Sequence, residues 1–563
     1  MQKLKRPHYI FFVGLAFLLG LIYFNNISAG FLPWDDDYNI PLNPYFLQGQ
    51  WLEIWNHFYF GMYIPLTSSL WGFLFALGKG SSIPFRVFNL SLHLLNSYLV
   101  FEIAKLWFSE LSSRTYWFCL FAALFFLIHP LQVDAVAWVS GGRDLLASFF
   151  ALLSLLCFLK LKSSKGFWLA GGLFVLSLLS KPQEATLPLV IFLISLQKAP
   201  HLWKKQGLKM LAWCAPVFLV ALVTYLKQKE IVLPSISLWQ RPFVMFDSFG
   251  FYLAKIIWPF PLNVDYGRTP TYFLSHFTME WFPTFLLLIS FSVLIFLGGL
   301  FKKSGPLILF LCALSCLLPV SGLVDFAFQS ISTTANHYVY FSMVFFILFF
   351  LEILKDQKIS SHFIVLGFAA LAAGYTWASR TRVQSWQNSK IFFETILDSN
   401  PDSRAGLMGL AQYLSDQENN HLKALELFEK VLRQKPKDII AISNISTVLL
   451  RLKRFEAVAD MESWLFDLEF QNLMPRRNVD SANFLNSLGL AMANLGRADL
   501  GLLYICQADD INPIRPGFKT NVDKLIDLLQ LKSPGIVCPH FVNFTEFINA
   551  AFLWRYRQKK DSR

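Results

Sequence analysis

Three adjacent carboxylates, Asp35, Asp36 and Asp37, stand between Trp34 and Tyr38, just after the first long apolar run of the chain. Like charges held so close together at a membrane surface are costly unless a cation, a metal ion or a reacting group uses them. Carboxylates can act as general bases. An isolated acidic triplet is more typical of a solvated loop that caps the next helix, so the triplet alone favours the loop and leaves the site as the alternative.

A second group of polar residues stands at the ends of later apolar runs. They are His129, Asp134, Arg143, Lys181, His337 and Tyr338. Carboxylates supply a base or bind a metal ion, whereas arginine, lysine and histidine can bind a phosphate. These are the parts that a transferase needs when its donor is a lipid phosphate.

A polar stripe marks the second long run. Arg86, Asn89, His93 and Asn96 recur at spacings of three and four residues, which places them on one face of a helix. Such a stripe within a bilayer normally faces the protein interior. It can serve hydrogen bonding between helices or line a substrate site, and the spacing does not decide between the two.

The composition that surrounds these residues is that of a polytopic membrane protein. Aliphatic, aromatic and cysteine residues make up 55% of the 563 residues and charged residues only 15%, far from a soluble globular average. Apolar runs lie near 9–27, 85–108, 116–130, 145–159, 167–180, 185–197, 208–226, 248–260, 282–301, 306–325, 338–354 and 362–379. Since about 20 apolar residues cross a bilayer as a helix, we expect an all-α membrane domain over residues 1–380.

Basic residues in short loops predict the orientation of the spans. Lys3, Lys5 and Arg6 precede the first run, which favours a cytoplasmic N-terminus. The later loops agree if the segment 248–260, with Lys255 at its middle, lies at the interface and does not cross. About eleven crossings result. An odd number places the rest of the chain on the extracytoplasmic side with the acidic triplet, in the bacterial periplasm or the lumen of the endoplasmic reticulum.

Net charge and cysteine content exclude other classes. The net charge of +12 needs no nucleic-acid partner, because much of it lies in loops expected to face the anionic inner leaflet. The seven cysteines are scattered, and several fall within predicted spans. We therefore expect small core residues, with neither a metal site nor a disulfide framework.

Two stretches that we expect outside the membrane differ from the spans in residue pattern. Residues 30–84 form a large extracytoplasmic loop, whose aromatic and amphipathic character predicts helices on the membrane interface. Farther on, Pro401 and Pro436 are 35 residues apart, close to the tetratricopeptide period of about 34 residues. Pro513 follows 77 residues later, as two repeats with an insertion would place it. We predict a tetratricopeptide-repeat α-solenoid over residues 381–563, a fold that binds proteins along a concave surface.

The order of these motifs resembles that of the transmembrane and tetratricopeptide-repeat family of O-mannosyltransferase-like proteins, within the GT-C superfamily. The motifs are Trp34-Asp35-Asp36, Asn43-Pro44, Pro65-Leu66-Thr67, Asn89 with His93, His129-Pro130, Asp134-Ala135-Val136, Arg143-Asp144-Leu145-Leu146, Lys181-Pro182, Trp258-Pro259 and Asp265-Tyr266. The resemblance implies transfer of a sugar, commonly mannose, from a polyprenyl-phosphate donor in the membrane to a protein hydroxyl on the extracytoplasmic face. The repeats would bind the acceptor protein.

The resemblance also implies roles for single residues. Counting back from Asn43-Pro44 aligns the family's acidic pair with Asp35 and Asp36. Asp36 would be the general base of an inverting displacement, with Asp35 orienting it and Asp134 as a further catalytic carboxylate. Cationic candidates for the leaving phosphate are Arg143, Lys181, His337 and Arg86. Further residues expected to line the site are His129, Asn89, His93 and Tyr338.

Three departures from the family keep alternatives open. Asp134 replaces the usual glutamate, Asn336-His337 replaces an acid and an arginine, and Ile64 replaces an arginine. A non-catalytic membrane scaffold for protein interaction is one alternative, and a transporter, which would need mid-span charges or inverted repeats, is another. A divalent metal ion could sit between carboxylates and a phosphate, although no ligand spacing demands one. The residues name neither the sugar nor the acceptor.

Overall fold

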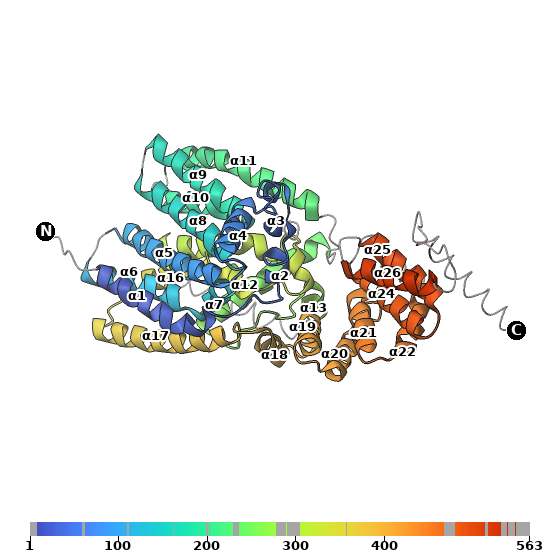
Figure 1. The fold of residues 1–563 in the computed structure, drawn as a ribbon. Helices are drawn as coiled ribbons and strands as arrows, with labels where there is room; N and C mark the ends of the chain where they lie inside the picture. Colours follow the sequence, from blue (N-terminus) through green and yellow to red (C-terminus); the bar gives the residue numbers. More distant parts are fainter. Residues whose placement is uncertain are drawn as a thin grey trace. The chain divides into compact units, whose positions relative to one another are not determined.

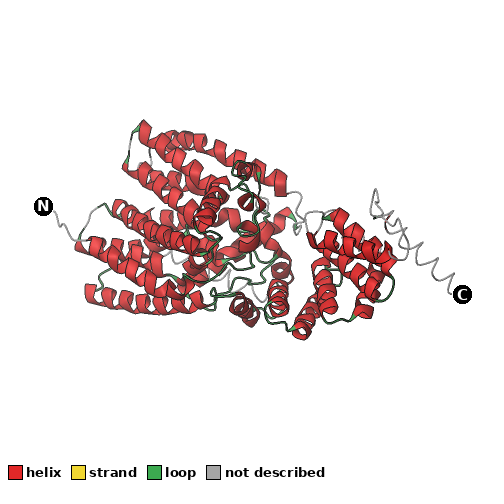
Figure 2. Ribbon diagram, viewed as in Figure 1, coloured by secondary structure: helices red, strands yellow, loops and turns green. Residues whose placement is uncertain are grey.

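The computed structural model is all-helical in its regular elements, as Figure 2 shows. It describes residues 8–58, 62–109, 112–161, 163–198, 201, 203–228, 236–276, 289, 304–355, 357–466, 479–512, 516–530, 538 and 547. No β-strand occurs within these residues, so the all-α fold predicted from the sequence is confirmed. The chain forms two compact units, Met1–Asn400 and Pro401–Arg563.

The first unit is a bundle of long helices joined by short ones. Its α-helices are α1 (His8–Tyr23), α2 (Asp36–Asn39), α3 (Pro44–Leu47), α4 (Pro65–Leu77), α5 (Ile83–Trp107), α6 (Ser113–Ile128), α7 (Val133–Ala137), α8 (Gly142–Lys160), α9 (Ser164–Ser180), α10 (Leu187–Lys198), α11 (Trp203–Gln228), α12 (Arg241–Ile257), α13 (Pro270–Ser275), α15 (Ser304–Leu317), α16 (Met343–Lys355), α17 (Ser361–Gln384) and α18 (Ser389–Ser399). Helix α5 packs against both α6 and α8, and α8 packs against α9 (Figure 1). Helix α15 packs against α10 and α16.

Five described helical segments are long and apolar enough to cross a membrane, and a sixth results if the bent pair Ser113–Ile128 and Pro130–Ala137 counts as one span. The five are Tyr9–Asn26, Ile83–Trp107, Gly142–Lys160, Trp203–Thr224 and His362–Gln384. The predicted interfacial segment 248–260 overlaps α12, which is not among them. The predicted span 282–301 lies, apart from residue 289, outside the described residues. The number of about eleven crossings stays a prediction.

The loop after α1 carries a small core of its own. Ile40, Ile54, Ile64 and Trp71 are buried in one cluster, which also includes Val139 from the connection between α7 and α8. Each such side chain stabilises the fold by about 1.5–3 kcal/mol when it is fully buried. The cluster therefore holds the segment with the acidic triplet against the start of α8.

The second unit consists of successive packed helices. They are α19 (Arg404–Asp416), α20 (His421–Gln434), α21 (Ile439–Arg451), α22 (Phe455–Asp460), α24 (Val479–Asn494), α25 (Ala498–Ile511) and α26 (Pro516–Gln530). The pairs α19 and α20, α24 and α25, and α25 and α26 pack side by side. The predicted apolar face of the first hairpin, with Ala424, Phe428 and Val431, is buried. The tetratricopeptide assignment stays a prediction, and much of its insertion near 470–480 lies outside the described residues.

The expectation that the cysteines are small core residues, and not part of a disulfide framework, is wrong for one pair. Cys506 in α25 is bonded to Cys538, with Cα atoms 5.7 Å apart. Helix α26 packs against α25, and Cys538, which follows α26 in the sequence, lies beside Cys506. No local spacing could reveal this, because the pairing depends on how the helices fold back. Disulfides persist in oxidising compartments.

Candidate functional site

The site is built on the connection that joins α6 to α8, which is buried along its length from residue 128 to residue 148. The Asn89 side chain of α5 donates a hydrogen bond of 3.0 Å to the carbonyl of Trp138 in this connection. A Cβ atom on Gly142 would lie 2.6 Å from Asn89 Oδ1, so a larger residue where α8 begins would displace this amide. The result is that Arg143 and Asp144 stand in the first turn of α8.

Five ionisable residues then form what we call the charged cluster: Asp35, Arg143, Asp144, Lys181 and Glu184. Arg143 Nη2 lies 3.4 Å from Asp35 Oδ2 and its Nε 3.9 Å from Asp144 Oδ2. Lys181 Nζ donates to Asp144 Oδ1 at 2.5 Å. The side chain of Asp35 is 25% exposed and that of Arg143 only 6%. Asp35 is therefore the carboxylate of the cluster that a substrate can reach.

Aromatic rings pack against the side chains of Arg143 and Lys181. The Arg143 guanidinium lies 4.7 Å from the ring centroid of Trp138, and Lys181 Nζ lies 5.1 Å from that of Tyr338. The His337 ring packs against both, at 5.5 Å from Trp138 and 4.3 Å from Tyr338. Cation–π contacts of this kind hold a cation without neutralising it.

Several buried donors in this enclosure have no hydrogen-bond acceptor within the described part of the chain. They are Nε and Nη1 of Arg143 and Nε1 of Trp138. A buried donor without a partner costs about 1–3 kcal/mol, and native proteins rarely leave one unexplained. Three such donors in one place suit an anionic ligand that accepts from them.

Burial sets the protonation of the cluster. It raises the pKa of Asp35 to about 6, although Arg143 beside it acts in the opposite direction. It raises the pKa of Glu184 to about 8, assisted by Asp144 and opposed by Lys181, so Glu184 is neutral at pH 7. Burial also lowers the pKa of His337 well below its ordinary value, and the charges of Lys181 and Arg143 add to this. His337 is thus an uncharged imidazole at pH 7 and not a cation.

Asp36 has a different environment from Asp35. It is fully buried, and its Oδ1 accepts hydrogen bonds from the backbone N–H and the hydroxyl of Ser140, at 2.9 and 2.6 Å. Its Oδ2 accepts from the backbone N–H of Leu32 at 3.1 Å. These bonds tie the first loop to the α7–α8 connection, so Asp36 positions the segment that carries Asp35.

Asp134 is the centre of a second buried group, which does not include Arg143 or Lys181. Its two oxygens accept four side-chain hydrogen bonds: from Arg382 Nε and Nη2, at 2.8 and 3.0 Å, from Trp386 Nε1 at 2.9 Å and from Asn336 Nδ2 at 2.7 Å. The Trp386 ring stacks on Trp138, with centroids 6.1 Å apart. Asp134 therefore supports, through Trp386, the ring on which Arg143 lies.

Three other predicted residues hold helices together in the structure. Arg86 is buried and donates to the carbonyls of Ala29, Gly30 and Ala137 and to Asn26 Oδ1. His93 contacts Tyr340 Oη at 2.7 Å and the Leu127 carbonyl at 3.0 Å. His129 contacts the Ile256 carbonyl at 3.2 Å and the Leu131 N–H at 3.3 Å.

The structure thus brings five of the predicted site residues together: Asp35, Arg143, Lys181, His337 and Tyr338. The other six make supporting contacts elsewhere: Asp36, Asp134, Asn89, His93, His129 and Arg86.

Sequence reasoning missed Glu184, Trp138 and Arg382. Glu184 follows Lys181 by three residues, and Arg382 follows the last apolar run, 362–379, by three residues; both positions were available signals. Among the described residues, no three His, Cys, Asp or Glu side chains gather as metal ligands, and we derive no step through a metal ion.

The fold is that of a polytopic all-α membrane protein, and its charged cluster has buried donors that would suit an anion. No protein-family model matches the chain. Curated relatives do match, and they are protein O-mannosyl-transferases named TMTC2. The chain is 30% identical over 237 residues to that of Mus musculus and 31% identical over 236 residues to that of Homo sapiens. It is 27% identical over 255 residues to that of Xenopus laevis.

These relatives confirm the resemblance drawn from the sequence motifs. The matches cover 39% of this chain and 25% of the mouse and human proteins, and 43% and 27% in the Xenopus comparison. The chain therefore spans about a quarter of the length of the curated relatives that it matches.

Proposed function

We propose that this chain is a membrane glycosyltransferase of the GT-C type, which transfers mannose from a polyprenyl-phosphate donor to a protein hydroxyl with inversion. The observation that carries the proposal is the pairing of Asp35, which is partly exposed, with Arg143, whose Nε and Nη1 find no hydrogen-bond acceptor among the described residues. A base for the acceptor and a cation for the leaving group thus lie 3.4 Å apart. The names of the curated relatives support the same activity.

These positions support the following reaction. The acceptor hydroxyl attacks the anomeric carbon of the sugar, and Asp35 takes its proton. The bond from that carbon to the phosphate oxygen breaks, and the polyprenyl phosphate leaves with the electron pair. Arg143 Nε and Nη1 and the Trp138 indole N–H donate to the phosphate, which stabilises the charge that develops there. Lys181 pairs with Asp144 Oδ1 and adds positive potential.

This proposal assigns the base to Asp35 and not to Asp36. All donors around Asp36 come from the protein, and no part of its side chain is exposed. A base must come within about 3 Å of the proton that it removes, and a fully enclosed carboxylate cannot do so. Asp35 has both the exposure and a pKa of about 6, which keeps it ionised at pH 7.

We place the site and the repeat unit on the extracytoplasmic side, with the N-terminus in the cytoplasm. The disulfide between Cys506 and Cys538 in the second unit supports this side, because thiols stay reduced in the cytosol. The second unit, with its packed helical pairs, would bind the acceptor protein.

The test compares Asp35→Asn with Asp37→Asn in the purified full-length protein. Both changes remove one charge from the same triplet, but only Asp35 contacts Arg143 in the structure. Labelled mannose is supplied as mannosyl-phosphoryl polyprenol with extracytoplasmic acceptor proteins, and protein-bound label is counted. We expect Asp35→Asn to lose about 100-fold or more of the rate and Asp37→Asn to stay within about threefold.

Two results would contradict the proposal. Full activity of a folded Asp35→Asn protein would show that Asp35 is not the general base. A complete absence of transfer by the wild-type chain, together with loss of a cellular phenotype on deletion of residues 386–563, would favour the membrane scaffold instead.

A further inference from the structure

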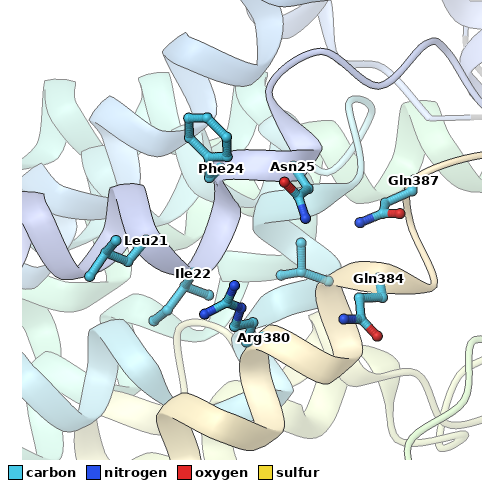
Figure 3. Close-up of a pocket in the computed structure, with 8 residues that line it drawn as sticks. Leu21, Ile22, Phe24, Asn25, Arg380, Gln384 and Gln387 are labelled. Atoms are coloured by element: carbon cyan, nitrogen blue, oxygen red, sulfur yellow. The ribbon is translucent and has the colours of Figure 1, made fainter.

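A cavity of about 110 Å³ lies between the C-terminal ends of α1 and α17. Figure 3 shows Leu21 and Ile22 on one side, and Arg380 and Gln384 of α17 on the other. Its lining includes no residue of the charged cluster and neither Asp36 nor Asp134. The volume exceeds that needed for several water molecules and has room for one phosphate head group. It is a site distinct from the one described above.

The helices on both sides of the cavity present apolar faces outward. The hydrophobic windows of Tyr9–Asn26 and His362–Gln384 are only 28% and 17% buried inside the protein. Tyr9, Val13 and Phe17 form an exposed stripe along α1 that leads to the cavity, and Phe363, Leu366 and Trp377 are exposed along α17. Faces of this kind contact acyl chains in a bilayer.

The polar side chains of the cavity lie at the end toward the loops. Arg380, Gln384 and Gln387 follow one another along α17 and beyond it, and Asn25 faces them from the end of α1 (Figure 3). None of the four side chains has a hydrogen-bond or ion-pair partner within the described residues. Polarity therefore rises from the apolar stripes to an arginine and then to amides, as it does along a phospholipid from acyl chain to phosphate to head group.

We propose that this cavity binds one anionic phospholipid whose head group is an uncharged polyol. The Arg380 guanidinium pairs with the phosphodiester, and the amides of Asn25, Gln384 and Gln387 hydrogen-bond the hydroxyls. The acyl chains lie along the exposed stripes of α1 and α17.

The lining chemistry separates this occupant from other lipids. The cavity contains no carboxylate, so the cation of a choline or ethanolamine head group finds no charged partner. The glycosyl donor is also a lipid phosphate, but a phosphate at Arg380 would not contact Asp35 or Arg143, which lie outside the lining. The proposal thus goes beyond the proposed function and does not depend on it.

Binding to this site should stabilise the packing of α1 against α17, because a ligand of the folded state raises its stability by mass action. Helix α17 also carries Arg382, which holds Asp134. The bound lipid would therefore contact, on its membrane-facing surface, the helix whose Arg382 holds Asp134.

The test measures lipid binding to the purified full-length protein by native mass spectrometry. The probes are phosphatidylglycerol, phosphatidylcholine and phytanyl phosphate, the last as an analogue of the donor lipid. The variant Arg380→Gln removes the cation. The matched control is Lys358→Gln, which removes an exposed charge three residues before the start of α17. The double variant Gln384→Ala/Gln387→Ala weakens the head-group contacts and keeps the charge.

We expect the wild-type protein to bind one phosphatidylglycerol at least about tenfold tighter than phosphatidylcholine. Arg380→Gln should lose this preference, the double variant should lose part of it, and Lys358→Gln should keep it. Equal affinity for the two phospholipids, or an unchanged preference in Arg380→Gln, would overturn the proposal. So would competition between phytanyl phosphate and phosphatidylglycerol that Arg380→Gln abolishes, because the cavity would then be a donor site. Mannose transfer is measured in detergent without phosphatidylglycerol, where Arg380→Gln should equal Lys358→Gln, so failure of the lipid site and failure of the transferase assignment are distinguished.

Discussion

Replacing Asp134 by asparagine should destabilise the first unit, because Asp134 is the only charge that faces Arg382 in the hydrogen bonds of the described residues. Asparagine keeps the shape of the side chain but replaces one acceptor by a donor. Its amide would then face either Arg382 and Trp386 or Arg382 and Asn336, all of which donate. The guanidinium of Arg382, with only 5% of its side chain exposed, would be left without a counterion.

The size of the effect follows from the burial. Breaking a buried ion pair by removing one partner costs about 3–5 kcal/mol. The first unit spans Met1–Asn400, and the unfolding entropy of globular proteins is about 2.1 cal/mol/K for each residue. The midpoint of thermal unfolding should therefore fall by about 4–6 °C.

The assay is thermal unfolding of the detergent-solubilised full chain, followed by tryptophan fluorescence. Glu53→Gln, which neutralises an exposed carboxylate of the first unit, is the matched control and should shift the midpoint by less than about 1 °C. Arg382→Gln should be destabilised like Asp134→Asn, and the double variant should be less destabilised than the two single effects predict together.

An Asp134→Asn protein that unfolds within 1 °C of the wild type would refute the structural role. If the same protein had also lost all transfer activity, Asp134 would be a catalytic carboxylate, as the sequence resemblance implied.

Three further predictions use the protonation of the charged cluster and the disulfide. Because Asp35 must be ionised to act as base and its pKa is about 6, kcat/KM should be flat above pH 7 and fall about tenfold per unit below pH 6; a constant value down to pH 5 would contradict this role. Burial raises the pKa of Glu184 from 4.5 to about 8, so the folded state keeps a proton that the unfolded chain releases, and stability should decline by up to about 1 kcal/mol per unit between roughly pH 5 and 8. Glu184→Gln should lessen that decline, and melting curves that shift with pH in parallel for variant and wild type would argue against it. Cys506→Ser opens a disulfide of sequence separation 32, which should lower the free energy of unfolding by about 3–4 kcal/mol and speed limited proteolysis of the second unit. Cys214→Ser, at an exposed free cysteine, should do neither. Equal cleavage rates for the two variants would show that the disulfide contributes nothing.

The sequence by itself determined the class of fold and the set of candidate residues. Composition and the length of the apolar runs require helices in a membrane, because lipid offers no partner to the backbone. The change to a polar helical period near residue 386 indicated a second unit from residue 381, whereas the structure divides the chain between Asn400 and Pro401. Arg143, Lys181 and the acidic triplet were recognisable because charged residues at the ends of spans are costly without a function.

Only the tertiary structure decided what each of these residues does. Asp35 and Asp36 are adjacent and chemically alike, yet the Asp36 side chain is buried against Ser140, whereas the Asp35 side chain lies beside Arg143. Asp134 is separated from Arg382 by 248 residues, so no local pattern could pair them. The protonation of His337 also depends on packing, because its neighbours Lys181 and Arg143 come from other helices. Charge and spacing mark a residue as a candidate, but desolvation and partners, which come from distant segments, assign its role.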